Sequence, residues 1–346
     1  MLARAAVLER LGERLAIHSL DLGPPSAGQV LVKVLFSGVC RSQLMEVQGK
    51  RGTDPWLPHL LGHEGSGIVE AIGAGVSKVR PGDAVILTWI KGEGLDAPGG
   101  FFQRNGERIN AGAVTTFSDY TVVSENRLVH KPPGLGFDLA VLFGCALPTG
   151  GGMVMNELDV RPGSTAIVLG LGGVGLSALM TLRALGVERP IAIDSSPAKL
   201  ELASSWGAIP VPGDHPELQR EVFRHIPGGA DFCIEAGGSV NTIELGFSLI
   251  RKGGGQLLFA SHPPEGQMIC LHPHELISGK RIAGSWGGAV RPDRDVPRLH
   301  QLLQSSGPLE SLLTQRYTLD QVNDALSDLE AGRVFRPLLD MGHPLP

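Results

Sequence analysis

The fold of this 346-residue chain is decided by residues 164–182, STAIVLGLGGVGLSALMTL. The stretch carries no charge over 19 residues, which is about the length of a membrane-spanning helix. Its first part, however, is strand-like and rich in β-branched residues, its middle is rich in glycine, and its last part is helical in character. We therefore predict a strand, a tight turn and a helix here, and no membrane span.

Glycines recur through the predicted turn as G-x-G-x-x-G, at Gly170, Gly172 and Gly175, with Gly173 inside the motif. In a strand–turn–helix unit the first glycine permits the tight turn, the second lets a pyrophosphate approach the backbone, and the third packs helix against strand. The helix N-terminus adds unpaired N–H groups and the positive end of its dipole. The pattern predicts a dinucleotide-binding turn, with a glycine-rich turn of no function as the alternative.

An acidic residue follows where a dinucleotide site requires one. Asp194 ends the next strand-like segment, 19 residues after Gly175, and can accept hydrogen bonds from both ribose hydroxyls. Ser195 and Ser196 come next, and no arginine is available there to bind a 2′-phosphate. The carboxylate also repels that phosphate, so we expect NAD and not NADP as the cofactor.

The pattern of expected strands and helices changes along the chain. The first third reads mainly as short strands and turns, with a loop predicted at residues 91–112 because they lack periodicity. After residue 163, strand-like and helical segments alternate, which is typical of a parallel sheet covered by helices on both faces. Helical spacing returns in the tail from about Asp293.

Charge and cysteine content exclude some classes of partner. The net charge is −5 and there is no basic run, so we expect no nucleic acid and no membrane as a partner. The four cysteines are far apart, and acidic residues interrupt the apolar N-terminal stretch, so we expect no signal peptide and a cytoplasmic protein. A disulfide switch of Cys233 and Cys270 has little support, since both lie in apolar, strand-like surroundings and are expected to pack.

Two thiols and an imidazole are candidates for a metal site. Cys40, His63 and Cys145 supply two sulfurs and a nitrogen, and a catalytic zinc takes three protein ligands and keeps one open position. Taken alone, each cysteine could instead be a small core residue and the histidine a hydrogen-bonded polar one.

With these residues, the chain resembles the zinc-dependent alcohol dehydrogenases of the medium-chain dehydrogenase/reductase family over nearly its whole length. The segments that carry the resemblance, in the family's order, are CRS, GHEGSGIVEAIGAGV, GDAV, TTFSDYTVV, GLGGVGLSALM, GKRIAGSWGG and LEAGRVFRPLL. The resemblance implies an α/β protein with a GroES-like β-rich catalytic domain at 1–148, completed by 290–346. It also implies a Rossmann doubly wound, NAD-binding domain at 149–289, and a homodimer or homotetramer.

The resemblance implies roles for residues around the metal. One zinc ion would bind Cys40, His63 and Cys145. Glu64 would lie close by, able to approach the metal when water or substrate exchanges. Ser42 would take the proton of the substrate hydroxyl.

Further positions match cofactor contacts of the family. Arg41 and Arg336 resemble arginines that pair with the cofactor pyrophosphate, although each could be a solvated surface arginine. Lys199 matches a lysine that contacts the adenosine ribose. Val174 would lie behind the nicotinamide ring and Thr149 beside it.

Two aromatic positions match the substrate pocket of the family. Trp89 and Phe117 would form an apolar wall, with plain core packing as the alternative for both.

The chain departs from the family pattern at three places. Residues 90–115 contain no cysteine, so the structural zinc of the longer members is not expected. Gln43 stands where many members have an aspartate that braces the zinc ligands, and its loss lowers metal affinity about 10–100-fold unless the glutamine makes the same hydrogen bonds. Met45 replaces a histidine that ends the family's proton relay, and a thioether cannot carry a proton.

The resulting hypothesis is a reversible oxidation of a primary or secondary alcohol to an aldehyde or ketone, with zinc as Lewis acid and NAD as hydride carrier. A metal-free quinone or enoyl reductase of the same superfamily is one alternative. A protein that binds NAD but catalyses no reaction is another alternative. Gln43 and Met45 favour it, because both depart from the family pattern near the zinc ligands and in the proton relay.

Overall fold

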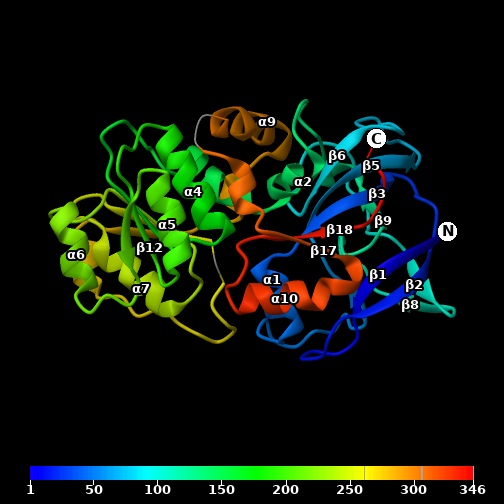
Figure 1. Ribbon diagram of the computed structural model, residues 1–346, viewed down its shortest axis with the longest axis horizontal. Coiled ribbons are helices and arrows are strands. Elements are labelled where there is room, and N and C mark those ends of the chain that lie inside the picture. Colours follow the sequence, from blue (N-terminus) through cyan, green and yellow to red (C-terminus); the bar gives the residue numbers. More distant parts are fainter. Residues whose placement is uncertain (261, 305–306, 346) are drawn as a thin grey trace. The chain divides into compact units, whose positions relative to one another are not determined.

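The computed structural model describes residues 1–260, 262–304 and 307–345 (Figure 1). The chain divides into two compact units. The first unit comprises Met1–Cys145, Arg291–Pro297 and Leu309–Pro346, and the second comprises Ala146–Val290 and Arg298–Pro308.

The first boundary falls after Cys145, three residues before the expected one at 148. Helix α3 (Ala146–Gly152) belongs to the second unit because it packs closely on α4 (Gly173–Ala184). A Cβ on Gly150 would lie 2.0 Å from a carbonyl oxygen of α4, so the two helix backbones are nearly in contact there. Residues 298–308, expected with the catalytic domain, also group with the second unit.

The first unit is built on two sheets whose strand pairs are nearly all antiparallel. One sheet has the order β4-β1-β2-β7-β8, and the other has the order β10-β6-β5-β3-β18-β17 with β9 also paired to β3. In chain order its strands and helices are β1 (Leu2–Leu8), β2 (Ala16–Leu22), β3 (Gln29–Gly38), α1 (Arg41–Val47), β4 (His59–Leu60), β5 (Glu64–Ile72), β6 (Ala84–Thr88), β7 (Phe102–Arg104), β8 (Glu107–Ile109), β9 (Tyr120–Ser124), η1 (Glu125–Arg127), β10 (Leu128–His130), α2 (Phe137–Ala140), η2 (Val141–Gly144), η5 (Leu309–Leu312), β17 (Gln315–Thr318), η6 (Leu319–Gln321), α10 (Val322–Glu330) and β18 (Pro337–Asp340).

Strand β3 is the centre of the larger sheet and delivers the chain to the candidate metal ligands. It pairs with β5, β9 and β18, and every residue except half-buried Lys33 is buried. At its end Ser37 pairs with Gly65 of antiparallel β5. Cys40 follows the end of β3 and His63 precedes the start of β5, so this pairing brings the two residues to one edge of the sheet.

The loop predicted at residues 91–112 contains a hairpin, so that expectation is wrong in part. β7 and β8 pair antiparallel on either side of Asn105 and Gly106, whose φ angles are 53° and 84°. An Asn-Gly pair at positive φ is the preferred centre of a two-residue hairpin turn. The local signal was present in the sequence, but the flanking strands are only three residues long and show little alternation.

The second unit is a parallel sheet of the order β13-β12-β11-β14-β15-β16 with helices packed against it. Each neighbouring pair of strands is parallel. Figure 1 shows α4, α5 and α7 beside β12 of this sheet. The elements are α3, η3 (Met153–Glu157, a π-helical turn), β11 (Ala166–Leu169), α4, β12 (Ile191–Asp194), α5 (Pro197–Ser205), β13 (Ile209–Pro212), α6 (Leu218–His225), β14 (Phe232–Glu235), α7 (Val240–Leu249), β15 (Gln256–Phe259), α8 (Pro273–Ile277), β16 (Arg281–Gly284) and η4 (Gly287–Ala289), while α9 (Pro292–Leu303) runs from the first unit into the second.

The strand order of the second unit is that of a doubly wound dinucleotide-binding sheet. The order reverses between β11 and β14, and ligands of such sheets bind at the carboxyl ends of the strands beside this point. The uncharged stretch at 164–182 supplies β11, the glycine turn and most of α4, as predicted.

No single described helix has the length and hydropathy needed to cross a membrane. One bent pair, Phe137–Gly144 with Ala146–Glu157, meets that test by length and composition only.

Two glycines of the turn provide a matched pair of stability variants. A Cβ on Gly175 would lie 1.9 Å from the carbonyl oxygen of Gly170, whereas a Cβ on Gly172 would meet nothing within 4 Å. We expect Gly175→Ala to lower the free energy of unfolding of the cofactor-free protein by about 1–3 kcal/mol. Gly172→Ala should change it by less than about 0.5 kcal/mol. Urea unfolding followed by circular dichroism measures both, and equal losses would contradict this packing role of Gly175.

Candidate metal and dinucleotide sites

Two thiols and one imidazole meet in the first unit, although they come from three distant segments. Cys40 is the N-cap of α1, His63 lies between β4 and β5, and Cys145 follows η2. Their Sγ and ring nitrogen atoms all lie within 4.8 Å of one another, and His63 Nε2 is 3.2 Å from Cys145 Sγ. The structure therefore brings together the three residues that the sequence predicted as metal ligands.

The electrostatics of this cluster favour a thiolate. The hydrogen bond with Cys145 holds the pKa of Cys40 well below its usual range, and the charge of Arg336 acts in the same direction. The same hydrogen bond, together with burial, raises the pKa of Cys145. Thiolate sulfur is the form that binds a metal, and two sulfurs with one imidazole nitrogen form a ligand set of catalytic zinc.

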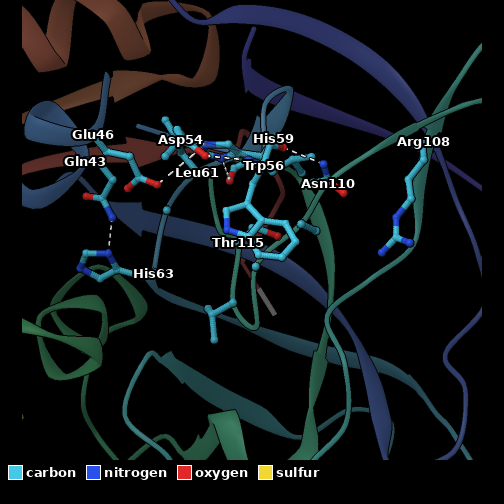
Figure 2. Close-up of a pocket in the computed structure, with 15 residues that line it drawn as sticks. Gln43, Glu46, Asp54, Trp56, His59, Leu61, His63, Arg108, Asn110 and Thr115 are labelled. Carbon is cyan, nitrogen blue, oxygen red and sulfur yellow. Dashed lines mark hydrogen bonds and ion pairs between the residues drawn. The ribbon is translucent and has the colours of Figure 1, made fainter. Parts of the chain in front are cut away.

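Gln43 makes the hydrogen bonds expected of the missing aspartate. Its side chain is 1% exposed and lies on the first turns of α1. Its Oε1 accepts the backbone N–H of Cys40 at 2.8 Å, and its Nε2 contacts Nδ1 of His63, as Figure 2 shows. The glutamine therefore touches two of the three candidate ligands.

The amide nevertheless matches its two neighbours incompletely. His63 directs Nε2 toward Cys145, so if Nε2 binds a metal, Nδ1 carries the ring proton and becomes a donor. The N–H of Cys40 is also a donor, and an amide has only one oxygen to accept from both. A carboxylate has two acceptor oxygens, one for each donor. Gln43 thus holds the position of the brace but satisfies one hydrogen bond fewer in the metal-bound state.

A buried ion pair lies next to the metal ligands. Glu64 is fully buried at the start of β5, and its Oε1 pairs with the guanidinium of Arg336, which is itself buried. Burial raises the pKa of Glu64, and the positive charge of Arg336 opposes that change. The alternative of a solvated surface residue is therefore wrong for Arg336, whereas its contact with a pyrophosphate stays a prediction. Arg41, in contrast, is exposed at the first turn of α1.

Two glycines that sequence reasoning missed make room for this carboxylate. A Cβ on Gly38 would lie 2.7 Å from the Glu64 side chain, and one on Gly144 would lie 2.8 Å from it. Each glycine stands one or two residues before a candidate thiol ligand, in GVC at Cys40 and GC at Cys145. This repeated placement of a glycine just before each thiol was the sequence signal that could have identified these two glycines.

The glycine turn of the second unit has the geometry that the motif predicts. Gly170 has a φ of 89°, in the left-handed region that favours glycine, and Gly172 is the N-cap of α4. The close contact of Gly175 with Gly170 is the expected helix–strand packing. Gly173 is the first residue of α4, and half-buried Val174 follows it.

Asp194 lies directly beside this turn. Its Oδ2 accepts the N–H of Leu171 at 2.6 Å, and its Oδ1 accepts the N–H of Ser196 at 2.9 Å. Lys199 Nζ is 3.7 Å from Oδ2. The structure thus places the predicted ribose-binding acid and lysine at the glycine turn. Thr149 is buried on α3 of the same unit.

The structure places the two residues predicted as a substrate wall in different surroundings. Phe117 is fully buried and packs with Leu61 and Val39 in the core of the first unit, which agrees with the alternative of core packing. Trp89 is half-buried after β6, and its carbonyl oxygen accepts a hydrogen bond from Arg127, so its place in a substrate wall stays a prediction. The cavity that includes His63 in its wall is lined by neither of them but by residues from the segment before that histidine and from 108–115.

The two remaining cysteines do not both pack. Cys233 is fully buried on β14, where burial raises the pKa of its thiol. Cys270 is exposed and lies outside any strand, so the expectation that it packs is wrong. The apolar run MIC around Cys270 suggested a strand, but Met268 is also exposed.

A carboxylate at position 43, which has a second acceptor oxygen, tests whether Gln43 leaves one hydrogen-bond donor of the metal ligands unsatisfied. We expect Gln43→Glu to lower the dissociation constant of zinc about tenfold, because both donors then find a carboxylate oxygen. Gln43→Leu should raise it by a similar factor. Competition with a chromogenic chelator measures the constant, with Gln103→Glu, a half-buried position on β7, as the control for added charge. Equal constants for the protein and Gln43→Glu would refute this role.

Comparisons with known proteins agree with this architecture. Residues 26–133 match the family model of the alcohol dehydrogenase GroES-like domain, and residues 173–305 match that of the zinc-binding dehydrogenase. An S-(hydroxymethyl)glutathione dehydrogenase of Escherichia coli O1:K1 / APEC is 32% identical over 370 residues, covering 98% of this chain and 100% of that protein.

Solved structures give the same answer. The benzyl alcohol dehydrogenase of Acinetobacter calcoaceticus superposes with a TM-score of 0.89 at 28% identity, covering 99% of this chain and 100% of that one. An alcohol dehydrogenase zinc-binding domain protein from Burkholderia ambifaria gives a TM-score of 0.90 at 27% identity over 99% of this chain and 100% of that chain. The chain therefore belongs to the zinc-dependent alcohol dehydrogenases of the medium-chain dehydrogenase/reductase family.

Proposed function

We propose that this protein oxidises an alcohol reversibly to an aldehyde or ketone, with one catalytic zinc ion and NAD. The observation that carries the proposal is the meeting of Cys40, His63 and Cys145 within 4.8 Å in the first unit. A metal-free quinone or enoyl reductase has no need of this ligand set. The absence of cysteine from residues 90–115 supports a single zinc ion.

The ligand set fits zinc by its chemistry. Cys40 is held toward the thiolate form, and Gln43 orients His63 through Nδ1 so that Nε2 faces the sulfurs. When bound, the ion supplies Lewis-acid polarisation of the substrate oxygen, which lowers the pKa of the hydroxyl or activates the carbonyl. Buried Arg336 offsets part of the negative charge that two sulfurs and Glu64 place in this region.

Ser42 is the residue of this chain that we propose to take the substrate proton. Its Oγ is buried and has no hydrogen-bond partner among the described residues, so its lone pairs are available. The next residue of the family's relay is missing, since half-buried Met45 cannot bind a proton. Proton release must therefore use another group, and the pH profile should differ from that of relatives with a histidine there.

The second unit binds the cofactor in this proposal. NAD supplies the hydride acceptor when bound. The glycine turn offers backbone N–H groups and an open surface at Gly172, and Asp194 offers carboxylate oxygens to the adenosine ribose. Val174 and Thr149 are the residues of this unit that we assign to the nicotinamide, and Arg41 and Arg336 to the pyrophosphate.

The proposal also includes a homodimer or homotetramer in the cytoplasm. Its support is the family resemblance and the cysteines, none of which forms a disulfide in the part of the chain that the structure describes.

Removal of one thiol tests the metal. We expect one zinc per chain in protein purified without chelators, and Cys145→Ala should lose zinc and about a thousandfold in kcat/KM, since Lewis-acid stabilisation contributes several kcal/mol. Cys270→Ser, a change at the exposed thiol, is the matched control and should keep both. Zinc is measured by mass spectrometry and activity by NADH absorbance. Full activity of metal-free Cys145→Ala would support a metal-free reductase. A protein that holds zinc and binds NADH but turns over no alcohol would support the alternative of an NAD-binding protein without catalysis.

Asp194 tests the choice of dinucleotide. Asp194→Ala removes the ribose acceptor and the charge that repels a 2′-phosphate, so the ratio of kcat/KM for NAD to that for NADP should fall about a hundredfold. Steady-state kinetics with both cofactors measure the ratio, and thermal unfolding checks that the lost bonds to Leu171 and Ser196 leave the unit folded. An unchanged ratio in a folded variant would show that Asp194 does not select the cofactor.

A further inference from the structure

A cavity of about 410 Å³ lies in the first unit and has the candidate metal ligand His63 in its wall (Figure 2). Gln43, which orients that histidine, lines it as well. The rest of the wall combines polar and apolar side chains. The polar ones are those of Glu46, Asp54, His59, Arg108, Asn110 and Thr115, and the apolar ones are those of Trp56, Leu60, Leu61, Ala111 and Val114.

Two carboxylates face each other across a buried imidazole in this wall. Nε2 of His59 is 2.8 Å from Asp54 Oδ2 and 3.9 Å from Glu46 Oε1. The imidazole is anchored through Nδ1, which donates to the carbonyl oxygen of Leu60 at 3.0 Å. Glu46 also pairs loosely with Arg51 at 3.6 Å. An ionised carboxylate has about four acceptor positions, so both acids retain sites for further hydrogen-bond donors.

Trp56 is tied to the cavity wall through its backbone, and the residue is largely exposed. Its N–H donates to Asp54 Oδ1 at 2.9 Å, and its carbonyl oxygen accepts Asn110 Nδ2 at 2.6 Å. The residue is 67% exposed, and Figure 2 shows the indole between the His63 and Arg108 sides of the cavity. An aromatic face beside two acceptors gives the wall an apolar part and a hydrogen-bonding part.

This wall discriminates among classes of alcohol. A wholly apolar alcohol would take water from Glu46 and Asp54 without giving them a donor, which is costly for charged groups. An anionic alcohol would meet two carboxylates in this wall and one cation, that of exposed Arg108. A ring that carries several hydroxyl groups presents C–H groups on its face and O–H donors at its edge, and both match the wall.

We propose that the substrate is a polyhydroxylated ring alcohol, such as a cyclic polyol or a sugar, whose face lies on Trp56 and whose hydroxyls donate to Glu46 and Asp54. This inference rests on the proposed function, because it names the substrate class of the same reaction.

The test compares kcat/KM for myo-inositol, D-glucose, benzyl alcohol and S-(hydroxymethyl)glutathione with NAD and the zinc-loaded protein. We expect one of the two ring polyols to exceed the other two substrates at least tenfold. In Glu46→Gln and in Trp56→Leu, the ratio of kcat/KM for that polyol to that for benzyl alcohol should fall about tenfold. Glu70→Gln, at an exposed position on β5 outside the cavity, is the matched control and should keep the ratio.

Two results would overturn the proposal. One is a preference for benzyl alcohol or the glutathione adduct, which would leave the alcohol dehydrogenase function intact. The other is an unchanged ratio in both cavity variants. If no alcohol is oxidised, the proposed function fails, and the binding role of the cavity is then tested separately by calorimetric titration of myo-inositol and D-glucose into the protein and into Glu46→Gln. Binding of one of these polyols that is weaker in Glu46→Gln would support a polyol site in the cavity. No binding of either polyol would overturn it.

Discussion

The site depends on one constraint, namely that three donor atoms separated by up to 105 positions in the chain must meet within 4.8 Å. The antiparallel pairing of β3 with β5 solves most of this problem, because the end of one strand and the start of the other lie at the same sheet edge. Cys40 and His63 are carried there by backbone hydrogen bonds. Cys145 joins them from the turn after η2, where Gly144 allows the backbone to approach Glu64.

The charges around this meeting point are mutually dependent. Two sulfurs and a fully buried carboxylate would be unstable together, and the buried guanidinium of Arg336 offsets part of their charge. The same guanidinium helps to hold the pKa of Cys40 low. Arg336 lies just before β18, whose antiparallel pairing with β3 holds this C-terminal segment beside the candidate ligands in the first unit.

Features that depend on neighbours in the sequence were predictable, and those that depend on neighbours in space were not. The Asn105-Gly106 turn was a readable local signal that its short, weakly alternating strands concealed. The sequence left two places for Phe117, a pocket wall and the core, because an aromatic residue suits both environments. Only the tertiary structure shows that it packs with Leu61 and Val39 in the core. Arg336 offered no sequence signal for its burial, since the partner that stabilises it, Glu64, is 272 positions away.

The sequence by itself determined the two-part architecture and the glycine turn with its acid, because these features rest on local backbone requirements. The three candidate metal ligands came from the family resemblance, since a lone cysteine or histidine has other common uses. Only the tertiary structure decided how Gln43 divides one acceptor between two donors, and which side chains line the cavity beside His63. Those outcomes depend on distances between strands and turns that share no local pattern, and such distances exist only once the sheets have formed.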